Sequence, residues 1–138
     1  MPYLELTMPK CDAEVKEKLA DELTKGFCQV MNYPPEIFGI HFREFEPGGC
    51  AHGGKVWNGE DKPYVTMLFH GPRINRETKG KLIETLTSVF TANTEDAWNP
   101  AIIIFEHPYA NIGVEGKPLA SINPALSERK HYYPLDDE

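Results

Sequence analysis

The chain has 138 residues, a formal net charge of −7 at pH 7, and 41% hydrophobic and 25% charged residues. The length fits one domain, which can bury roughly two-thirds of the surface of its unfolded chain. The composition is ordinary for a soluble globular protein, and the negative charge excludes nucleic acid, because phosphate binding needs a basic face. A small anionic ligand must therefore be held by a local group of cations.

The spacing of the cysteines and histidines and the length of the apolar runs argue against metal-binding, redox, membrane and secreted proteins. The three cysteines and five histidines show no metal-ligand or redox spacing. No apolar run has the length of a membrane span, and the first residues lack the basic flank and apolar core of a secretory signal. An odd number of cysteines then indicates reduced thiols. We expect a cytoplasmic protein without a metal and without membrane contact.

The first half of the chain predicts a strand, a helix and a second strand. Residues 3–8 (YLELTM) alternate apolar and polar side chains, which is typical of a strand. Asp12 then occupies the place of a helix N-cap. Apolar side chains next recur every four residues and predict a helix of about five turns with one apolar stripe. The stripe consists of Val15, Leu19, Leu23 and Phe27. The sequence NYPP ends this helix, and residues 37–45 predict the second strand.

A glycine-rich segment, EPGGCAHGGK (residues 46–55), follows the second strand. Glycine permits positive φ angles and close approach of chains, but the segment lacks the P-loop pattern and no helix follows it directly. We expect a short hairpin or coil that pairs with a neighbouring subunit. The segment PYANIGVEGK (residues 108–117) has the corresponding place in the second half, and we expect the same of it.

The second half repeats the first at an offset of 63 residues. At this offset PKCDAE aligns with PRINRE. The apolar residues Leu19, Leu23 and Phe27 align with Leu82, Leu86 and Phe90. A strand at 64–69, an N-cap at Asn75, a helix to about residue 92 and a strand at 101–105 follow the same order. Similarity at this period indicates one supersecondary unit used twice. The two repeat units span residues 2–60 and 63–120.

Together the two units predict an α+β fold, in which tandem βαβ units form a four-stranded mixed sheet with two helices on one face. The strands within each unit should run parallel, joined by a right-handed crossover. Residues 1–120 form this single domain, and residues 121–138 form a tail that either wraps the surface or is partly disordered. The other face of the sheet stays uncovered and should pack on other subunits. Four apolar residues are expected on it: Leu4, Leu6, Val65 and Met67.

Pro2 is the first candidate for chemistry. Removal of Met1, which a proline in second position normally permits, leaves a secondary amine at the chain terminus. An α-amino group titrates near ~7.7–8, and both burial and nearby cations lower that value. Such an amine can act as a general base near neutral pH. The alternative is a terminus that merely begins a strand, and a retained Met1 makes Pro2 an ordinary amide. Its counterpart Pro63 is internal and has no amine.

Arg73 and Arg76 form the second candidate group. They lie between a strand end and a helix start, where backbone N–H groups and the helix dipole favour anions. Two guanidinium groups there suit a carboxylate bound in bidentate fashion. If the first strands of the two units pair antiparallel, Pro2 lies near both arginines. The alternative is a solvated surface pair, and Lys10, the counterpart in the first half, is expected to be structural.

A proline-initiated βαβ unit that occurs twice in one chain resembles the tautomerase superfamily. The segments YPPEIFGIHF and YANIGVEG are similar to the macrophage migration inhibitory factor branch. The segment FHGPRINRETKGKL, with two arginines three apart, is similar to the cis-3-chloroacrylic acid dehalogenase branch. The resemblance covers residues 2–120. It implies a cofactor-free enzyme, a homotrimer, and catalytic roles for Pro2, Arg73 and Arg76 on a small carboxylate.

The resemblance adds two weaker candidates. Glu115 falls near a water-activating carboxylate of the dehalogenase branch, although the alignment needs a gap, and His52 falls where some relatives carry an acid–base residue. A structural role is equally open for both. Two departures argue against dehalogenation: Phe27 stands where that branch has a histidine, and Ile103 or Ile104 stands where it has a tyrosine.

Three functions are therefore compared. In the first, a tautomerase, Pro2 moves a proton between carbon and oxygen of a small 2-keto or enol carboxylate. In the second, a hydratase or dehalogenase of 3-haloacrylate-like acids, Pro2 is the acid and Glu115 activates water. In the third, the chain is a non-catalytic trimeric binding protein. We expect the tautomerase.

Overall fold

The computed structural model describes residues 2–95 and 98–122. The first repeat unit contains β1 (Tyr3–Pro9), α1 (Ala13–Met31), the 3-10 turn η1 (Pro35–Ile37), β2 (Gly39–Phe45), β3 (Ala51–His52) and β4 (Lys55–Val56). The second contains β5 (Thr66–Gly71), α2 (Arg76–Asn93), β6 (Ala101–Glu106), the 3-10 turn η3 (Tyr109–Asn111), β7 (Gly113–Val114), β8 (Lys117–Pro118) and α3 (Leu119–Ile122). Each main strand and helix lies at, or within a few residues of, the place that the sequence predicts.

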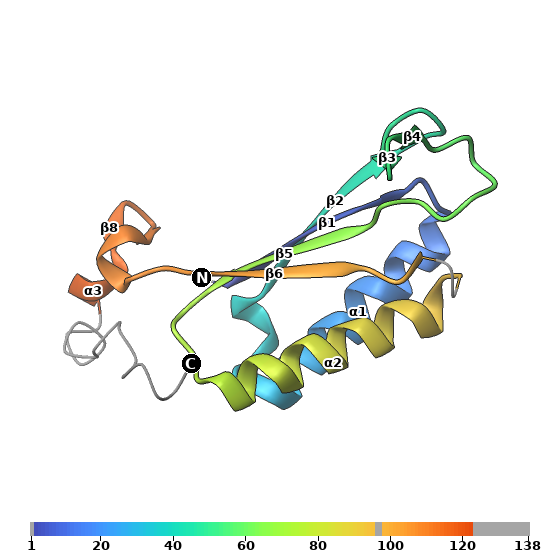
Figure 1. Ribbon diagram of the computed structural model, residues 1–138. Helices are drawn as coiled ribbons and strands as arrows, with labels where there is room; N and C mark the ends of the chain where they lie inside the picture. The colour runs from blue at the N-terminus through green and yellow to red at the C-terminus, as the bar shows by residue number, and fades with distance from the viewer. Residues whose placement is uncertain (1, 96–97, 123–138) are drawn as a thin grey trace.

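A four-stranded mixed sheet forms the centre of the molecule, in the order β2-β1-β5-β6 (Figure 1). β1 pairs parallel with β2, and β5 pairs parallel with β6, as the βαβ pattern predicts. The two units meet where β1 pairs antiparallel with β5, with Tyr3 opposite His70 and Thr7 opposite Thr66. The predicted α+β class and the tandem βαβ architecture are confirmed.

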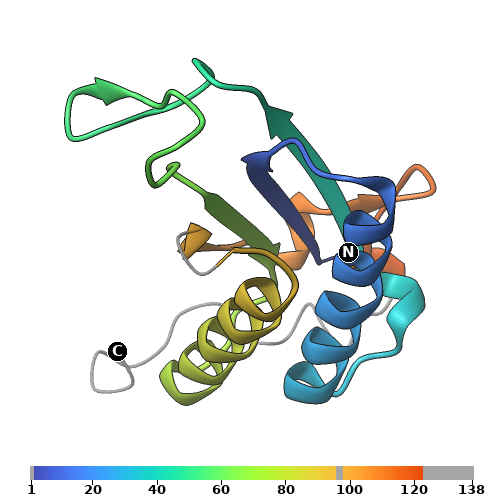
Figure 2. The same cartoon turned by 90° about the vertical axis from the view of Figure 1, so that its right-hand side faces the viewer.

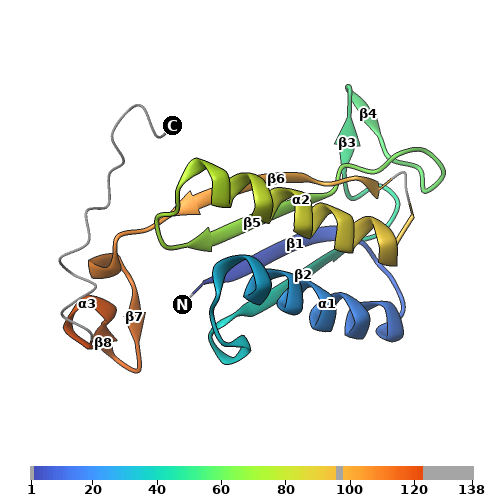
Figure 3. The same ribbon diagram turned by 90° about the horizontal axis from the view of Figure 1, so that it is seen from below.

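Both long helices cover the same face of the sheet. Figure 2 shows α1 and α2 side by side on one side of the strands, and Figure 3 shows α1 across β1 and β2 and α2 across β5 and β6. The helices approach each other closely at Gly26, where an added Cβ would lie 2.9 Å from the Cγ2 atom of Thr85. Glycine in the middle of α1 therefore serves helix packing, which offsets its low helix propensity.

The core lies between the sheet and the two helices. The predicted stripes face it: Leu19, Leu23, Phe27, Leu82, Leu86 and Phe90 are fully buried there. The strands contribute their own alternate residues, among them Leu4, Leu6, Val65 and Met67. The prediction that these four residues lie on the uncovered face is therefore wrong. The larger apolar set of each strand packs on the helices, because that contact removes the most apolar surface from water.

The open face of the sheet carries the alternate residues of each strand that do not face the helices. Tyr3, Glu5 and Thr7 of β1 have the opposite parity to the buried Leu4 and Leu6, and their side chains are half-buried. On β6 the open face carries Ile103 and Phe105, which are 50% and 41% exposed. This face is mixed in polarity, with polar groups on the inner strands and apolar side chains on the edge strand β6.

A glutamate beside each helix start repeats across the two units. Glu44 of β2 accepts hydrogen bonds from the Cys11 N–H (3.0 Å) and from the Lys16 Nζ (2.8 Å). Glu106 of β6 accepts in the same way from the Ile74 N–H (3.3 Å) and forms an ion pair with the Lys79 Nζ (2.6 Å). The predicted N-cap Asn75 accepts a hydrogen bond from the Thr78 N–H, whereas Asp12, at the N-cap position of α1, makes no capping bond. In both units a glutamate at the end of a strand therefore accepts a hydrogen bond from an N–H group in the loop that leads into the helix. The positive end of the helix dipole favours a negative charge at this place.

Glu44 should make stability depend on pH. The hydrogen bond from Lys16, and then that from the Cys11 N–H, lowers the pKa of Glu44 below its ordinary value. A carboxylate whose pKa falls on folding stabilises the protein above the unfolded pKa and loses that contribution as the pH falls through the folded pKa. We expect Glu44→Gln to lower the free energy of unfolding by about 1 kcal/mol at pH 7. The difference from the parent should shrink steadily below about pH 4.

Urea unfolding at several pH values measures this effect. The matched control is Glu84→Gln, since Glu84 is an exposed glutamate of α2. A destabilisation of Glu44→Gln that is the same at pH 3 as at pH 7 would contradict the assigned role.

Both glycine-containing segments form short hairpins. β3 pairs antiparallel with β4, and β7 pairs antiparallel with β8.

The second main strand begins at Gly39 rather than at residue 37, because Pro35–Ile37 forms a 3-10 turn. Within the described ranges no helix has the length and apolar character of a membrane span. The predicted tail falls almost wholly on residues 123–138, outside the described residues.

Candidate functional site

Pro2 lies at the start of β1, in the middle of the sheet. It is buried, and its carbonyl oxygen accepts a hydrogen bond from the Gly39 N–H at 3.3 Å. Because Tyr3 pairs with His70 in the antiparallel register, Pro2 comes beside Gly71, the last residue of β5. The predicted antiparallel pairing of the two first strands is therefore present. It brings Pro2 to the end of the sheet at which the loop to α2 begins.

Arg73 and Arg76 lie in that loop and in the first turn of α2. The Arg73 side chain is only 17% exposed, and its Nε atom lies 3.7 Å from Oε2 of Glu106. The Arg76 side chain is exposed at the first residue of the helix. Arg73 is therefore held by an acidic neighbour, whereas Arg76 faces solvent at the positive end of the helix dipole.

Glu115 reaches the same end of the sheet as Pro2. β6 runs antiparallel to β1, so the segment that follows β6 leaves the sheet where β1 begins. Figure 1 shows the β7–β8 hairpin and α3 beside the N-terminal end of β1. Glu115 is exposed and has a φ of 51°, a left-handed conformation that serves the tight turn of this hairpin.

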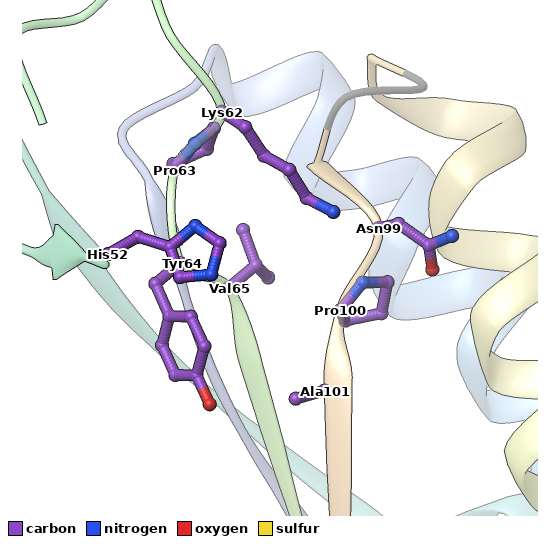
Figure 4. A pocket seen from close by; sticks show the side chains of 8 residues that line it. All are labelled: His52, Lys62, Pro63, Tyr64, Val65, Asn99, Pro100 and Ala101. Carbon is purple, nitrogen blue, oxygen red and sulfur yellow. The ribbon is translucent and has the colours of Figure 1, made fainter.

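His52 lies at the other end of the sheet. β2 runs parallel to β1, so the β3–β4 hairpin that follows β2 leaves the sheet far from Pro2 (Figure 1). The ring of His52 lies 5.6 Å from that of Tyr64, between centroids. It lines a cavity of about 260 Å³ with Pro63 and Lys62 (Figure 4). Within one chain, His52 therefore lies near the internal proline Pro63. The structure does not bring His52 to Pro2.

A histidine pair that the sequence does not predict lies at the Pro2 end of the sheet, where His70 is opposite Tyr3. Nδ1 of His70 and Nε2 of His107 lie 3.0 Å apart, at hydrogen-bond distance. The His70 ring is stacked on Tyr3, with centroids 4.5 Å apart, and on Phe105, with centroids 4.8 Å apart. Its Nε2 atom is buried without a hydrogen-bond partner and lies 3.7 Å from Oε2 of Glu5.

These histidines line a cavity of about 410 Å³ at the Pro2 end of the sheet. The residues that surround it include Tyr3, His70, Gly71, His107, Asn111 and Ile112. Tyr3 follows Pro2 in the chain, and Gly71 lies beside Pro2 in the register, so two neighbours of the proline line the cavity. Its volume falls within the range of small-ligand pockets.

Alternation along β5 could have revealed His70. Met67 and Phe69 are buried, so His70 must belong to the open face, opposite Tyr3. His107 follows β6 directly, and its partner position could not be read without the register of the two strands. In the described ranges no group of three or more His, Cys, Asp or Glu side chains is placed to hold a metal ion. The same end of the sheet thus carries a proline, a cationic helix start and an imidazole pair.

Comparison with known proteins finds similarity at the level of structure. No protein-family model matches the sequence, and no curated protein matches it either. A structure of Pt0534 inactivated by 2-oxo-3-pentynoate has a TM-score of 0.78 at 18% identity and covers 88% of this chain and 98% of its own. A fused 4-OT, described as an asymmetric trimer, has a TM-score of 0.77 at 21% identity, with coverages of 87% and 98%.

A third structure, N1 of the cis-3-chloroacrylic acid dehalogenase family, has a TM-score of 0.69 at 19% identity and covers 92% of this chain and 99% of its own. Each of these structures is matched over almost its whole length, so the similarity spans both repeat units. At such identities the similarity establishes the arrangement of the backbone. The chain therefore has the tandem βαβ fold of the tautomerase superfamily, as the sequence resemblance predicts.

Proposed function

We propose that the protein is a cofactor-independent tautomerase, in which the Pro2 amine moves a proton between carbon and oxygen of a small 2-keto or enol carboxylate. One observation carries the proposal: β1 pairs antiparallel with β5, which puts the start of β1 beside the cationic start of α2. The burial of Pro2 adds support, because burial disfavours the charged form of an amine and favours a base. The free thiols of all three cysteines are in keeping with a cytoplasmic location, which we propose as well.

The two arginines take unequal parts in substrate binding. Arg76 is exposed at the first residue of α2, and we assign its guanidinium group to bidentate binding of the substrate carboxylate. Arg73 lies near Glu106, which fixes its position and balances part of its charge. We assign to Arg73 the second contact to the carboxylate and to Arg76 the larger share of the binding free energy.

Ketonisation of the enol of phenylpyruvate, followed by ultraviolet absorbance, tests the proposal. We expect turnover that depends on enzyme concentration and exceeds the rate in buffer by orders of magnitude. Halide release from 3-haloacrylates is measured in parallel. Faster turnover of those acids would favour the hydratase or dehalogenase, in which Glu115 activates water. Binding without turnover of either substrate would favour the non-catalytic protein.

We also propose a homotrimer. Fused 4-OT structures are described as trimers, and the open face of this chain exposes Ile103 and Phe105 on its edge strand. Sedimentation velocity should give three times the 15.6 kDa chain mass at micromolar concentration. Phe105→Glu should shift the protein to smaller species, because it buries a charge in the interface. The control Ile83→Glu changes an exposed apolar residue of α2 and should leave the trimer intact. A 15.6 kDa species alone would contradict the assembly.

A further inference from the structure

We propose that His107, oriented by His70, is the second acid–base group of the Pro2 site and that the adjoining cavity of about 410 Å³ receives the substrate. The inference rests on the proposed tautomerase and adds to it the group that serves the substrate oxygen. It follows from two observations, a line of polar contacts that ends at His107 and the occurrence of the histidine pair only at the Pro2 end of the sheet, together with the chemistry that tautomerisation requires.

A line of polar side chains crosses the open face and leads to His107. Arg43 of β2 donates a hydrogen bond from its Nη2 to Oε1 of Glu5 at 2.9 Å. Oε2 of the same carboxylate lies 3.7 Å from Nε2 of His70, whose Nδ1 lies 3.0 Å from Nε2 of His107. Stacking on Tyr3 and Phe105 fixes the plane of the His70 ring. A line of this kind fixes the orientation of its last member.

The contacts also select the tautomers. A carboxylate beside Nε2 of His70 favours a hydrogen on that nitrogen, which leaves Nδ1 as an acceptor. Nε2 of His107 then donates to it, and Nδ1 of His107 is the ring nitrogen left for a ligand. Because His107 lines the cavity, the free nitrogen belongs to the imidazole that a bound molecule can reach.

The internal repeat provides a comparison within the chain. The glutamate and lysine pairs Glu44–Lys16 and Glu106–Lys79 occur in both units, as expected of structural contacts. The counterpart of His70 at the repeat offset is Thr7, and the counterpart of His107 in the paired strands is Phe45. The histidine pair thus occurs only at the end that carries Pro2, whereas the end with the internal Pro63 lacks it. This asymmetry is expected of a functional feature.

The chemistry of tautomerisation requires a proton at oxygen as well as at carbon. In the keto-to-enol direction, the neutral Pro2 amine takes a proton from C3, and the electrons of that C–H bond form the C2–C3 double bond. The carbonyl π electrons move to oxygen, which takes a proton from the imidazolium of His107. Pro2 is then an ammonium and His107 is neutral, and ketonisation runs through the same steps in reverse. No oxidant, reductant or further reactant is needed.

The test replaces His107 by glutamine. His107→Gln can keep a donor to His70 and lacks the free ring nitrogen, so kcat for ketonisation should fall on the order of 100-fold with a smaller change in KM. The matched control is His41→Gln, since His41 lies on the open face, makes a T-shaped ring contact with Tyr3 and does not line the cavity. The control should keep the parent kcat, and thermal unfolding of both variants shows that they fold.

A second measurement does not depend on turnover. The imidazole resonances of the parent protein are followed by nuclear magnetic resonance during titration with phenylpyruvate, and those of His70 and His107 should shift while those of His52 stay in place. Parent-like kcat in a folded His107→Gln, or no shift at His107, overturns the inference even if Pro2 proves essential. If the parent does not turn over the enol, the proposed function fails. The titration alone then decides whether the cavity binds 2-keto acids.

Discussion

A form of the protein that carries one extra residue before Pro2 is expected to lose all turnover of enol carboxylates. In that form the proline nitrogen belongs to a peptide bond, whose resonance removes the basicity of the amine. Retention of Met1 has the same effect, so each preparation is checked by intact mass before kcat/KM is measured. Pro2 is buried between β2 and β5, and the mechanism assigns His107 to the substrate oxygen, so the proton at carbon depends on the proline amine.

The matched control is Pro63→Ala. Pro63 is the counterpart of Pro2 in the second unit, but it is internal and contributes no amine. Its replacement should leave kcat/KM near that of the parent. Pro2→Ala keeps a terminal amine, a primary one, so activity should fall without disappearing. Normal turnover by the extended form would exclude Pro2 as the base.

Loss of either arginine should cost on the order of 10- to 100-fold in kcat/KM on an enol carboxylate. A hydrogen bond to a charged group contributes about 1.5–3 kcal/mol, and the protein as a whole repels anions, so the lost contact is not replaced. Arg76→Lys should restore only part of the activity, since lysine lacks the planar fork. The control is Lys10→Ala, the counterpart of Arg73 at the other end of the sheet, whose exposed side chain pairs with Glu46 at 3.9 Å.

The two arginine variants should differ in stability. Arg76 is exposed, so Arg76→Ala should leave the unfolding temperature nearly unchanged. Arg73 is mostly buried beside Glu106, so Arg73→Ala should lose about 1 kcal/mol of unfolding free energy as well as activity. Unchanged kinetics in both variants would discard carboxylate binding by the arginines and favour the non-catalytic protein.

The sequence predicts the backbone arrangement well, because local patterns and the repeat agree. The four-residue spacing of Leu19, Leu23 and Phe27 permits one buried helix face, and the structure buries all three. The parity of β1 could not be assigned in the same way. Tyr3 and Leu4 are both acceptable on a buried face, and only the packing of the core between the sheet and the helices decides that Leu4 is buried.

The sequence predicts those parts of the candidate site that depend only on the directions of the strands. Antiparallel pairing of β1 with β5 is enough to bring Pro2 to the loop of Arg73 and to send Glu115 to the same end. The contact of Arg73 with Glu106 and the pairing of His70 with His107 depend on the registers of the strands. Those registers arise from side-chain packing across the whole sheet, which no short motif encodes.

Alkylation by 2-oxo-3-pentynoate, the compound that inactivates Pt0534, tests the central claim most directly. A nucleophilic amine adds to the conjugated alkyne, forming a nitrogen–carbon bond while its proton passes to the neighbouring carbon. Peptide mass spectrometry after inactivation should find one adduct per chain, on the nitrogen of a terminal Pro2, and activity should fall in proportion to it. Cys11, Cys28 and Cys50 are the competing nucleophiles. Inactivation with the adduct only on a cysteine, or full activity with Pro2 alkylated, would contradict the role of Pro2 as the catalytic base.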